Sequence, residues 1–319
     1  IHRKNGYIQC PTRYFHLEDY ASKCGDFTLI EAGFVKPSYW NEYGFSSEEL
    51  AKIRSKPVAL LEFEEPNKYL VGDYPEAYSK DFSKIYTICP YTSELLNKKY
   101  NEKRRIPIFF PVHERYIRPI QKKTIDIIYS GHILAGELRN ELKYLANFNY
   151  AIISNSKDSL VTHRSVSYEE KMRLYSHSKI TLVHNIIFKP YLHRIMNIWL
   201  AGDYWNNKAF SQVPSPWRFW QLFTKNIHIP QLKSRVFEAA MSHSLILCRK
   251  DEFNVIERYF EPNKEFKYYE QGQLQETVNH VLSQYDDYKT IVERAYKRAI
   301  KEYTVSVFVK KYLKDIPRE

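Results

Sequence analysis

Apolar and polar residues alternate along the first third of the chain in blocks that predict strands separated by helices. Apolar runs with the length of buried strands occur at residues 27–33, 58–63, 84–89 and 106–110. Ser46-Ser-Glu-Glu49 has the form of a capping box, in which a serine and a glutamate satisfy backbone amides where a helix begins. A second helix is expected from Thr92. Strands and helices alternating at this spacing predict a parallel sheet with crossover helices.

The same alternation restarts after a basic, proline-containing linker at residues 111–123. Strands are predicted at residues 125–129, 150–154, 179–184 and 245–248. Helices are predicted at residues 136–148, 167–176, 234–242, 273–284, 286–302 and 305–313. Ser167-Tyr-Glu-Glu170 is a second predicted capping box. We therefore expect an α/β fold with two Rossmann-like parallel-sheet domains facing a cleft. The expected boundaries are residues 1–117, residues 118–304 and a C-terminal helix at 305–319.

Residues 186–230 interrupt this rhythm and are expected to form an aromatic-rich insertion. They hold four of the five tryptophans: Trp199, Trp205, Trp217 and Trp220. Basic residues lie among these rings. We interpret the segment as a subdomain that buries its own aromatics. The functional alternatives are an acceptor-binding lobe, a partner surface or a membrane-contacting patch.

Composition changes this picture only in part. The chain has 319 residues, of which 44% are hydrophobic and 27% charged, values that exclude intrinsic disorder. The formal net charge of +11 raises nucleic acid or an anionic membrane surface as a partner. A bias toward Lys, Asn, Ile and Tyr, as an AT-rich genome produces, explains the same charge. Charge alone therefore does not decide the function.

The cysteines and the length of the apolar segments indicate the cellular compartment of the protein. Four cysteines lie far apart, with no Cys-x-x-Cys pair, and are expected to be free thiols: Cys10, Cys24, Cys89 and Cys248. No apolar run approaches the roughly 18 residues of a membrane span. We expect a cytoplasmic protein, with peripheral membrane contact as an alternative. Because the chain begins at Ile1 without an initiator methionine, we also expect a trimmed domain or a reduced N-terminal half.

Candidate chemistry is expected beyond the carboxyl ends of the predicted strands, where open parallel sheets bind ligands. Ser130-Gly131-His132 follows one such strand, and Arg139 lies on the next helix. A glycine turn can expose backbone N–H groups that hold phosphate. The plain alternative is a turn without a ligand.

A second candidate begins at Lys233 and contains Arg235 and Glu238, three residues apart on one helix face. An arginine there suits a diphosphate through charge-assisted bonds, and a glutamate one turn later can accept from both hydroxyls of a ribose. The alternative is a surface ion pair between the two.

Two further candidates lie in the first half. Glu64 and Glu65 follow an apolar strand, where a carboxylate could act as the general base toward a sugar hydroxyl, or belong to a solvated acidic loop. Tyr91 and Thr92 are candidate acceptor-binding residues. The competing interpretation makes Thr92 or Ser93 a helix N-cap.

Residues 233–248 resemble a stretch of two-domain GT-B glycosyltransferases, in particular the CgeB/YkvP-like branch of group 1. Their sequence is Lys-Ser-Arg-Val-Phe-Glu-Ala-Ala-Met-Ser-His-Ser-Leu-Ile-Leu-Cys. Residues 127–131 and 167–184 match in order and spacing. The resemblance implies a nucleotide-sugar donor held by the second half. Arg235 would contact the diphosphate and Glu238 the ribose, while Ser130–His132 would face the phosphates or sugar and the first half would bind the acceptor.

Such enzymes generally need no bound metal or other cofactor, because cationic side chains stabilise the leaving diphosphate. The chain departs from the family pattern in three ways. His243-Ser244 replaces a small glycine, Pro230 stands where many retaining members have the first of two glutamates, and the aromatic insertion precedes the donor motif. The stereochemical outcome is therefore open.

The resulting hypothesis is a metal-independent hexosyl- or pentosyltransferase of polysaccharide biosynthesis. It would move a sugar from a nucleoside-diphosphate or nucleoside-monophosphate donor to a glycan or glycolipid acceptor, without nucleic acid as a partner. Its rivals are a nucleic-acid-binding protein, a non-catalytic GT-B-like interaction module, and a transferase of another phosphate-linked group such as glycerophosphate.

Overall fold

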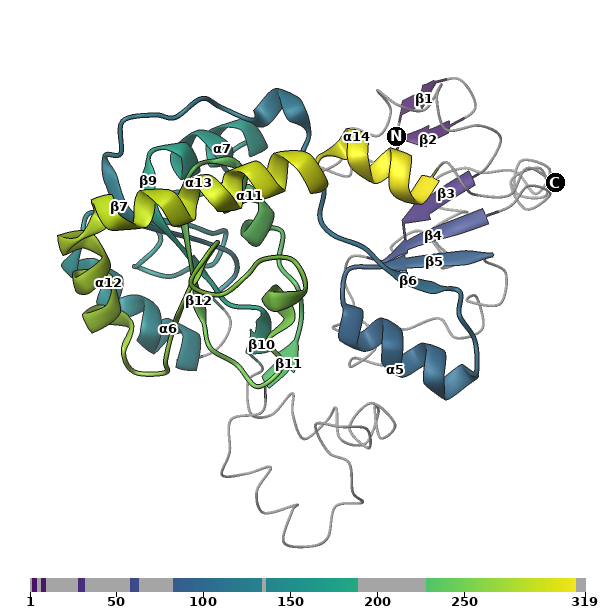
Figure 1. The fold of residues 1–319 in the computed structure, drawn as a ribbon, viewed down its shortest axis with the longest axis horizontal. Helices are drawn as coiled ribbons and strands as arrows, with labels where there is room; N and C mark the ends of the chain where they lie inside the picture. Colours follow the sequence, from purple (N-terminus) through teal and green to yellow (C-terminus); the bar gives the residue numbers. More distant parts are fainter. Residues whose placement is uncertain are drawn as a thin grey trace, which may run out of the picture. The chain divides into compact units, whose positions relative to one another are not determined.

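The computed structural model describes residues 83–133, 136–188 and 228–313, together with four strands of the N-terminal part. These four strands are β1 (His2–Lys4), β2 (Tyr7–Gln9), β3 (Thr28–Glu31) and β4 (Val58–Glu62). The chain divides into two compact units (Figure 1). The first contains Ile1–Phe109 and Phe308–Glu319, and the second contains Phe110–Pro190 and Ile227–Val307.

The first unit contains a four-stranded parallel sheet in the order β3-β4-β5-β6. Its later elements are β5 (Lys84–Thr87), α5 (Pro90–Tyr100) and β6 (Arg105–Pro107). The C-terminal segment η6 (Val309–Leu313) returns to this unit, where Tyr312 lies edge-on to Tyr86 with ring centres 6.0 Å apart. The aromatic contacts thus tie the end of the chain to its first sheet.

The second unit contains a five-stranded parallel sheet in the order β13-β12-β9-β7-β8. Its strands are β7 (Ile125–Ser130), β8 (Tyr150–Ile153), β9 (Ser178–Val183), β12 (Leu245–Arg249) and β13 (Lys267–Tyr269). β12 is buried at every position, as expected for a strand covered on both faces.

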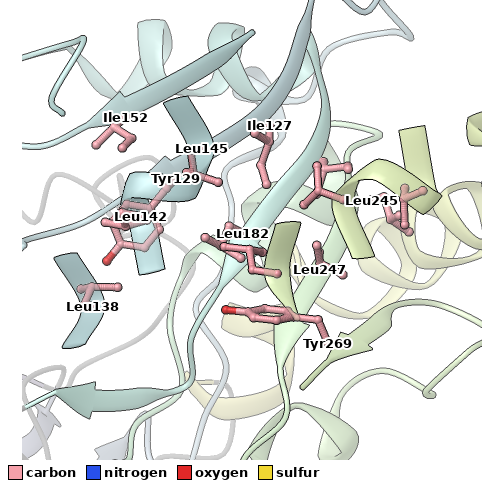
Figure 2. Close-up of a cluster of buried hydrophobic side chains, with 14 of the residues drawn as sticks. Ile127, Tyr129, Leu138, Leu142, Leu145, Ile152, Leu182, Leu245, Leu247 and Tyr269 are labelled. Atoms are coloured by element: carbon pink, nitrogen blue, oxygen red, sulfur yellow. The ribbon is translucent and has the colours of Figure 1, made fainter. Parts of the chain in front are cut away.

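Helices cover both faces of this sheet and bury its apolar side chains. The helices and helical turns are η3 (Glu114–Tyr116), α6 (Gly136–Leu142), η4 (Lys143–Asn147), α7 (Tyr168–Ser176), α11 (Arg235–Met241), η5 (Val255–Arg258), α12 (Leu274–Ser283), α13 (Tyr285–Glu302) and α14 (Val305–Phe308). Leu138 and Leu142 of α6 pack with Leu182 and Leu247 of the sheet in one buried cluster (Figure 2). α11 packs against α7 and α13.

The sequence pattern predicted this order of elements, with shifts at their ends. Ser167 is the N-cap of α7, as predicted, since its hydroxyl accepts from the Glu170 amide at 3.1 Å. The second bond of the predicted capping box does not form, because the Glu170 carboxylate accepts from the Arg173 guanidinium instead. The predicted helix at residues 136–148 is shorter, because α6 ends at Leu142 and continues as η4.

The interpretation of Thr92 or Ser93 as an N-cap is wrong. The helix α5 begins at Pro90, and its N-cap is Cys89, which makes no side-chain capping bond. Proline suits the first helical position because it lacks an N–H that would be unsatisfied there. The Ser93 hydroxyl instead donates to the Arg105 carbonyl at 2.9 Å.

The ends of the predicted insertion lie together. β10 (Ile186–Phe188) pairs antiparallel with β11 (His228–Pro230), with Ile186 opposite Pro230. The four insertion tryptophans lie outside the described residues, as do the expected Ser46–Glu49 capping box, Glu64, Glu65, Cys10 and Cys24.

Three features of the described residues bear on the sequence hypotheses. Cys89 and Cys248 are buried and form no disulfide. None of the described helices combines the length and apolar character needed to cross a membrane. Within the same part of the chain, no three His, Cys, Asp or Glu side chains are grouped as a metal site.

Candidate functional site

The carboxyl edge of the five-stranded sheet collects polar side chains from three adjacent elements. β7 ends at Ser130 and leads into Gly131, β9 ends just before His184, and α11 begins at Arg235. Tyr129 and Tyr269 belong to the buried cluster under this edge (Figure 2). Parallel strands present their carboxyl ends on one side, so residues far apart in sequence meet here.

Arg235 lies against the end of β7. Its guanidinium carbon is 4.7 Å from the centre of the Tyr129 ring, a cation–π arrangement. A side-chain carbon built on Gly131 would lie only 3.2 Å from the same guanidinium carbon and 3.0 Å from the Tyr129 hydroxyl. Gly131 also has φ +145°, which other residues rarely adopt. Glycine is therefore required at 131 for Arg235 to reach this position.

The charge of Arg235 is not neutralised by the described part of the chain. No carboxylate there forms an ion pair with it, and Glu238 acts on it only at longer range. Burial alone would lower its pKa, but Tyr129, Tyr175 and Glu238 outweigh that effect and raise the pKa above its usual value. Arg235 is thus a half-buried, permanently charged group at the sheet edge, which is the kind of group that binds anions.

Glu238 lies one turn further along α11 and is almost completely buried. Its side chain is 1% exposed, and its Oε2 lies 2.6 Å from Nζ of Lys171 on α7. The alternative of an ion pair between Arg235 and Glu238 does not describe this geometry, since the partner of Glu238 is Lys171. The structure thus separates the two charges that the sequence placed on one helix face.

The turn after β7 is held from both sides. The Ser130 and Tyr175 hydroxyls lie 2.6 Å apart, and burial raises the pKa of Tyr175, so that hydroxyl stays protonated. The Gly131 N–H donates to the Ile153 carbonyl at 3.0 Å. The Gly131 amide, which the sequence suggested as a phosphate ligand, is therefore already engaged by β8.

The other predicted donor residues have separate surroundings. His132 is exposed. The Arg139 guanidinium donates to the Asp158 carboxylate at 2.5 Å. The Lys233 amide donates to the side-chain oxygen of Asn185 at 3.1 Å, and its ammonium contacts Gln231. Of the predicted donor residues, the structure brings Gly131 and Arg235 together. The donor roles of His132, Arg139 and Lys233 stay predictions.

The predicted acceptor residues lie at the start of α5. Tyr91 is partly exposed, whereas Thr92 is completely buried. The Thr92 hydroxyl has no hydrogen-bond partner among the described residues. Both roles stay predictions, as do those of Glu64 and Glu65, which lie beyond the described end of β4 at Glu62.

Sequence reasoning missed a buried polar network beside Arg235. His184 Nε2 lies 3.0 Å from Glu141 Oε2 and 2.8 Å from the Tyr269 hydroxyl. Arg249 pairs with Glu137 at 2.8 Å. A usable signal was present, because His184 directly follows β9, and Arg249 and Tyr269 are the last residues of β12 and β13.

Comparison with known proteins gives a family match and several fold matches. A family model described as "Glycosyl transferase-like" matches residues 134–314, more than half of the chain. No curated protein sequence matches. Among solved structures, Anabaena HepE in complex with UDP and glucose has a TM-score of 0.53 at 8% identity, covering 92% of this chain and 79% of HepE.

A mutant of S. aureus TarM in complex with Fondaparinux, alpha-GlcNAc-glycerol and UDP is similar at a TM-score of 0.52 and 10% identity. The alignment covers 95% of this chain and 58% of TarM, so the chain spans little more than half of that protein's length. At these identities the likeness establishes the fold. The chain has the GT-B fold, with Rossmann-like parallel sheets, and belongs to the glycosyl transferase-like family.

Proposed function

We propose that this protein is a glycosyltransferase that moves a sugar from a nucleoside-diphosphate sugar to a glycan or glycolipid acceptor. The observation that carries the proposal is Arg235. It is a charged side chain at the ligand-binding edge of a parallel sheet, it rests on Tyr129 and Gly131, and no carboxylate of the described residues pairs with it.

Such an arginine is suited to the departing diphosphate. When the bond between the anomeric carbon and the β-phosphate oxygen breaks, negative charge grows on that oxygen. A cation already fixed in place stabilises this charge without further reorganisation. Gly131 leaves room for Arg235, and the Tyr129 ring holds the guanidinium in place. The charge of Arg235 then makes a bound metal unnecessary for the step.

Comparisons support a nucleotide-sugar donor. HepE was solved with UDP-glucose and with UDP, and a TarM mutant with UDP. Those ligands belong to those proteins. They make uridine diphosphate the first ligand to test here, and family membership favours sugar transfer over the nucleic-acid-binding and non-catalytic alternatives.

Within this proposal Glu238 accepts from the ribose hydroxyls. Because its carboxylate is 1% exposed and paired with Lys171, the Lys171 side chain has to move aside, or turn, when the nucleoside enters. Glu64 or Glu65 acts as the base that deprotonates the acceptor hydroxyl, which makes the reaction inverting. The CgeB/YkvP-like branch, a role in polysaccharide biosynthesis and contact with a membrane-borne acceptor also belong to the proposal.

A thermal-shift screen tests the proposal. A ligand that binds only the folded chain raises its stability by RT ln(1 + [L]/Kd). We expect UDP, GDP, CMP or dTDP, or one of their sugars, to raise the melting temperature of the wild-type chain but not of Arg235→Ala. Arg173→Ala is the matched control, because Arg173 is an exposed arginine on α7 that pairs with Glu170. A screen without any shift in the wild type contradicts the proposal.

A further inference from the structure

His184 occupies a central place in the buried network beside the candidate donor site. It follows β9, which lies between β7 and β12 in the sheet. Its side chain is 2% exposed. On one side its Nε2 meets Glu141 and Tyr269, and on the other its ring lies edge-on to Tyr129, with centres 5.8 Å apart.

The Tyr129 ring is contacted by both His184 and Arg235. His184 meets the ring at an interplanar angle of 64°. Arg235 lies over the same ring, 4.7 Å from its centre. Tyr129 is itself 2% exposed, so its orientation depends on what packs around it. A change at His184 can reach Arg235 through one intervening side chain.

The network around His184 combines a neutral ring with charged neighbours. Burial lowers the pKa of His184, and the nearby cations Arg235 and Arg249 lower it further, against the opposing effect of Glu141. Burial alone would raise the pKa of Glu141, but His184 and Arg249 outweigh it and lower the pKa. At neutral pH the imidazole is neutral and the carboxylate is ionised, so the single Nε2–H of His184 donates to Glu141, and the Tyr269 hydroxyl oxygen, 2.8 Å from the same nitrogen, accepts from that shared N–H. This bond fixes the orientation of the ring.

We propose that His184 is a positioning residue for donor binding. It holds the Tyr129 ring in the orientation on which Arg235 rests, and the Glu141 carboxylate and Tyr269 hydroxyl hold His184 in turn. The inference deepens the proposed function and rests on it, because Arg235 must be the diphosphate ligand. His184 itself touches no donor atom.

Calorimetric titration with UDP tests the inference in a double-mutant cycle. We expect His184→Ala to weaken UDP binding about tenfold in the wild-type background and to have no further effect in Arg235→Ala. His184→Gln, which keeps a donor within reach of Glu141 but lacks the ring, should show an intermediate loss. His280→Ala, on the outer helix α12, is the matched control and should bind UDP as the wild type does.

Melting temperatures of the same variants separate positioning from folding. If His184→Ala does not fold, His184→Gln and Tyr129→Leu carry the test, and their losses in UDP affinity should be non-additive. A melting temperature that falls while the Kd for UDP stays at the wild-type value in these variants overturns the inference alone. A wild-type chain that binds neither UDP nor another nucleotide overturns the proposed function, and the inference with it.

Discussion

The guanidinium of Arg235 lies over the ring of Tyr129, with 4.7 Å between the guanidinium carbon and the ring centre. The two residues come from the start of α11 and the end of β7, and Gly131 leaves the space in which they meet. This relationship joins the two sequence segments that pattern and resemblance had marked separately. It is the structural basis of the proposed donor site.

Gly131→Ala should damage this relationship directly. The new methyl group would lie 3.2 Å from the guanidinium carbon, at a φ of +145° that alanine avoids. We expect a loss of about 1–3 kcal/mol in unfolding free energy and weaker nucleotide binding, measured by urea denaturation and calorimetry. Gly136→Ala is the control, since its added carbon meets nothing within 4 Å. Equal nucleotide affinity in Gly131→Ala and Gly136→Ala would contradict the close packing of Gly131 against Arg235.

Lys171→Met should leave the buried Glu238 carboxylate without its cation. Removing one partner of a buried ion pair costs about 3–5 kcal/mol, because the remaining charge is uncompensated. Urea denaturation should show this loss, and the double variant Lys171→Met, Glu238→Gln should recover much of it. If the double variant is no more stable than the single one, the ion pair does not account for the effect.

Stability should rise with pH above about 8 because of Lys123. Its ammonium donates to the Ser176 and Ser242 carbonyls, and burial lowers its pKa to about 8. Above that pH the unfolded chain still binds a proton that the folded chain has released, so the unfolding free energy increases toward the unfolded pKa near 10.5. We expect an increase of about 1.5 kcal/mol between pH 8 and 9.5.

Lys123→Met should lack this increase. Lys122→Met, at the exposed neighbouring position, should keep it. Parallel pH profiles for the wild type and Lys123→Met would show that Lys123 titrates at its ordinary pKa.

Glu64→Gln and Glu65→Gln test the proposed base. We expect one of them to reduce turnover about 100-fold or more while nucleotide affinity stays unchanged, because a base acts on the acceptor hydroxyl and not on the donor. Release of the nucleoside diphosphate from the donor found in the screen provides the assay. Full turnover in both variants would exclude both glutamates.

Much of the second unit could be predicted from sequence, because its strands are continuous apolar runs and its helices carry local signals. The Ser167 N-cap was predictable because both partners of its bond lie within four residues. Prediction was weaker where competing signals overlap, as at Pro90, where a proline at the first helical position displaced the expected cap.

Long-range pairing was beyond the sequence pattern. Lys171 and Glu238 lie 67 positions apart on different helices, and only the packing of α7 against α11 brings them together. His184 and Glu141 likewise belong to a strand end and a helix whose own periodicity gives no sign of the contact. Burial of such charges is visible only in the folded chain.

The most direct test of Arg235 as the diphosphate ligand is the affinity of the chain for UDP. Calorimetry measures it for the wild type, Arg235→Ala and Arg235→Lys. We expect the wild type to bind UDP, Arg235→Ala to bind it about tenfold or more weakly, and Arg235→Lys to recover only part of the loss, because lysine cannot bind a diphosphate bidentately. Wild-type affinity in Arg235→Ala would contradict the account.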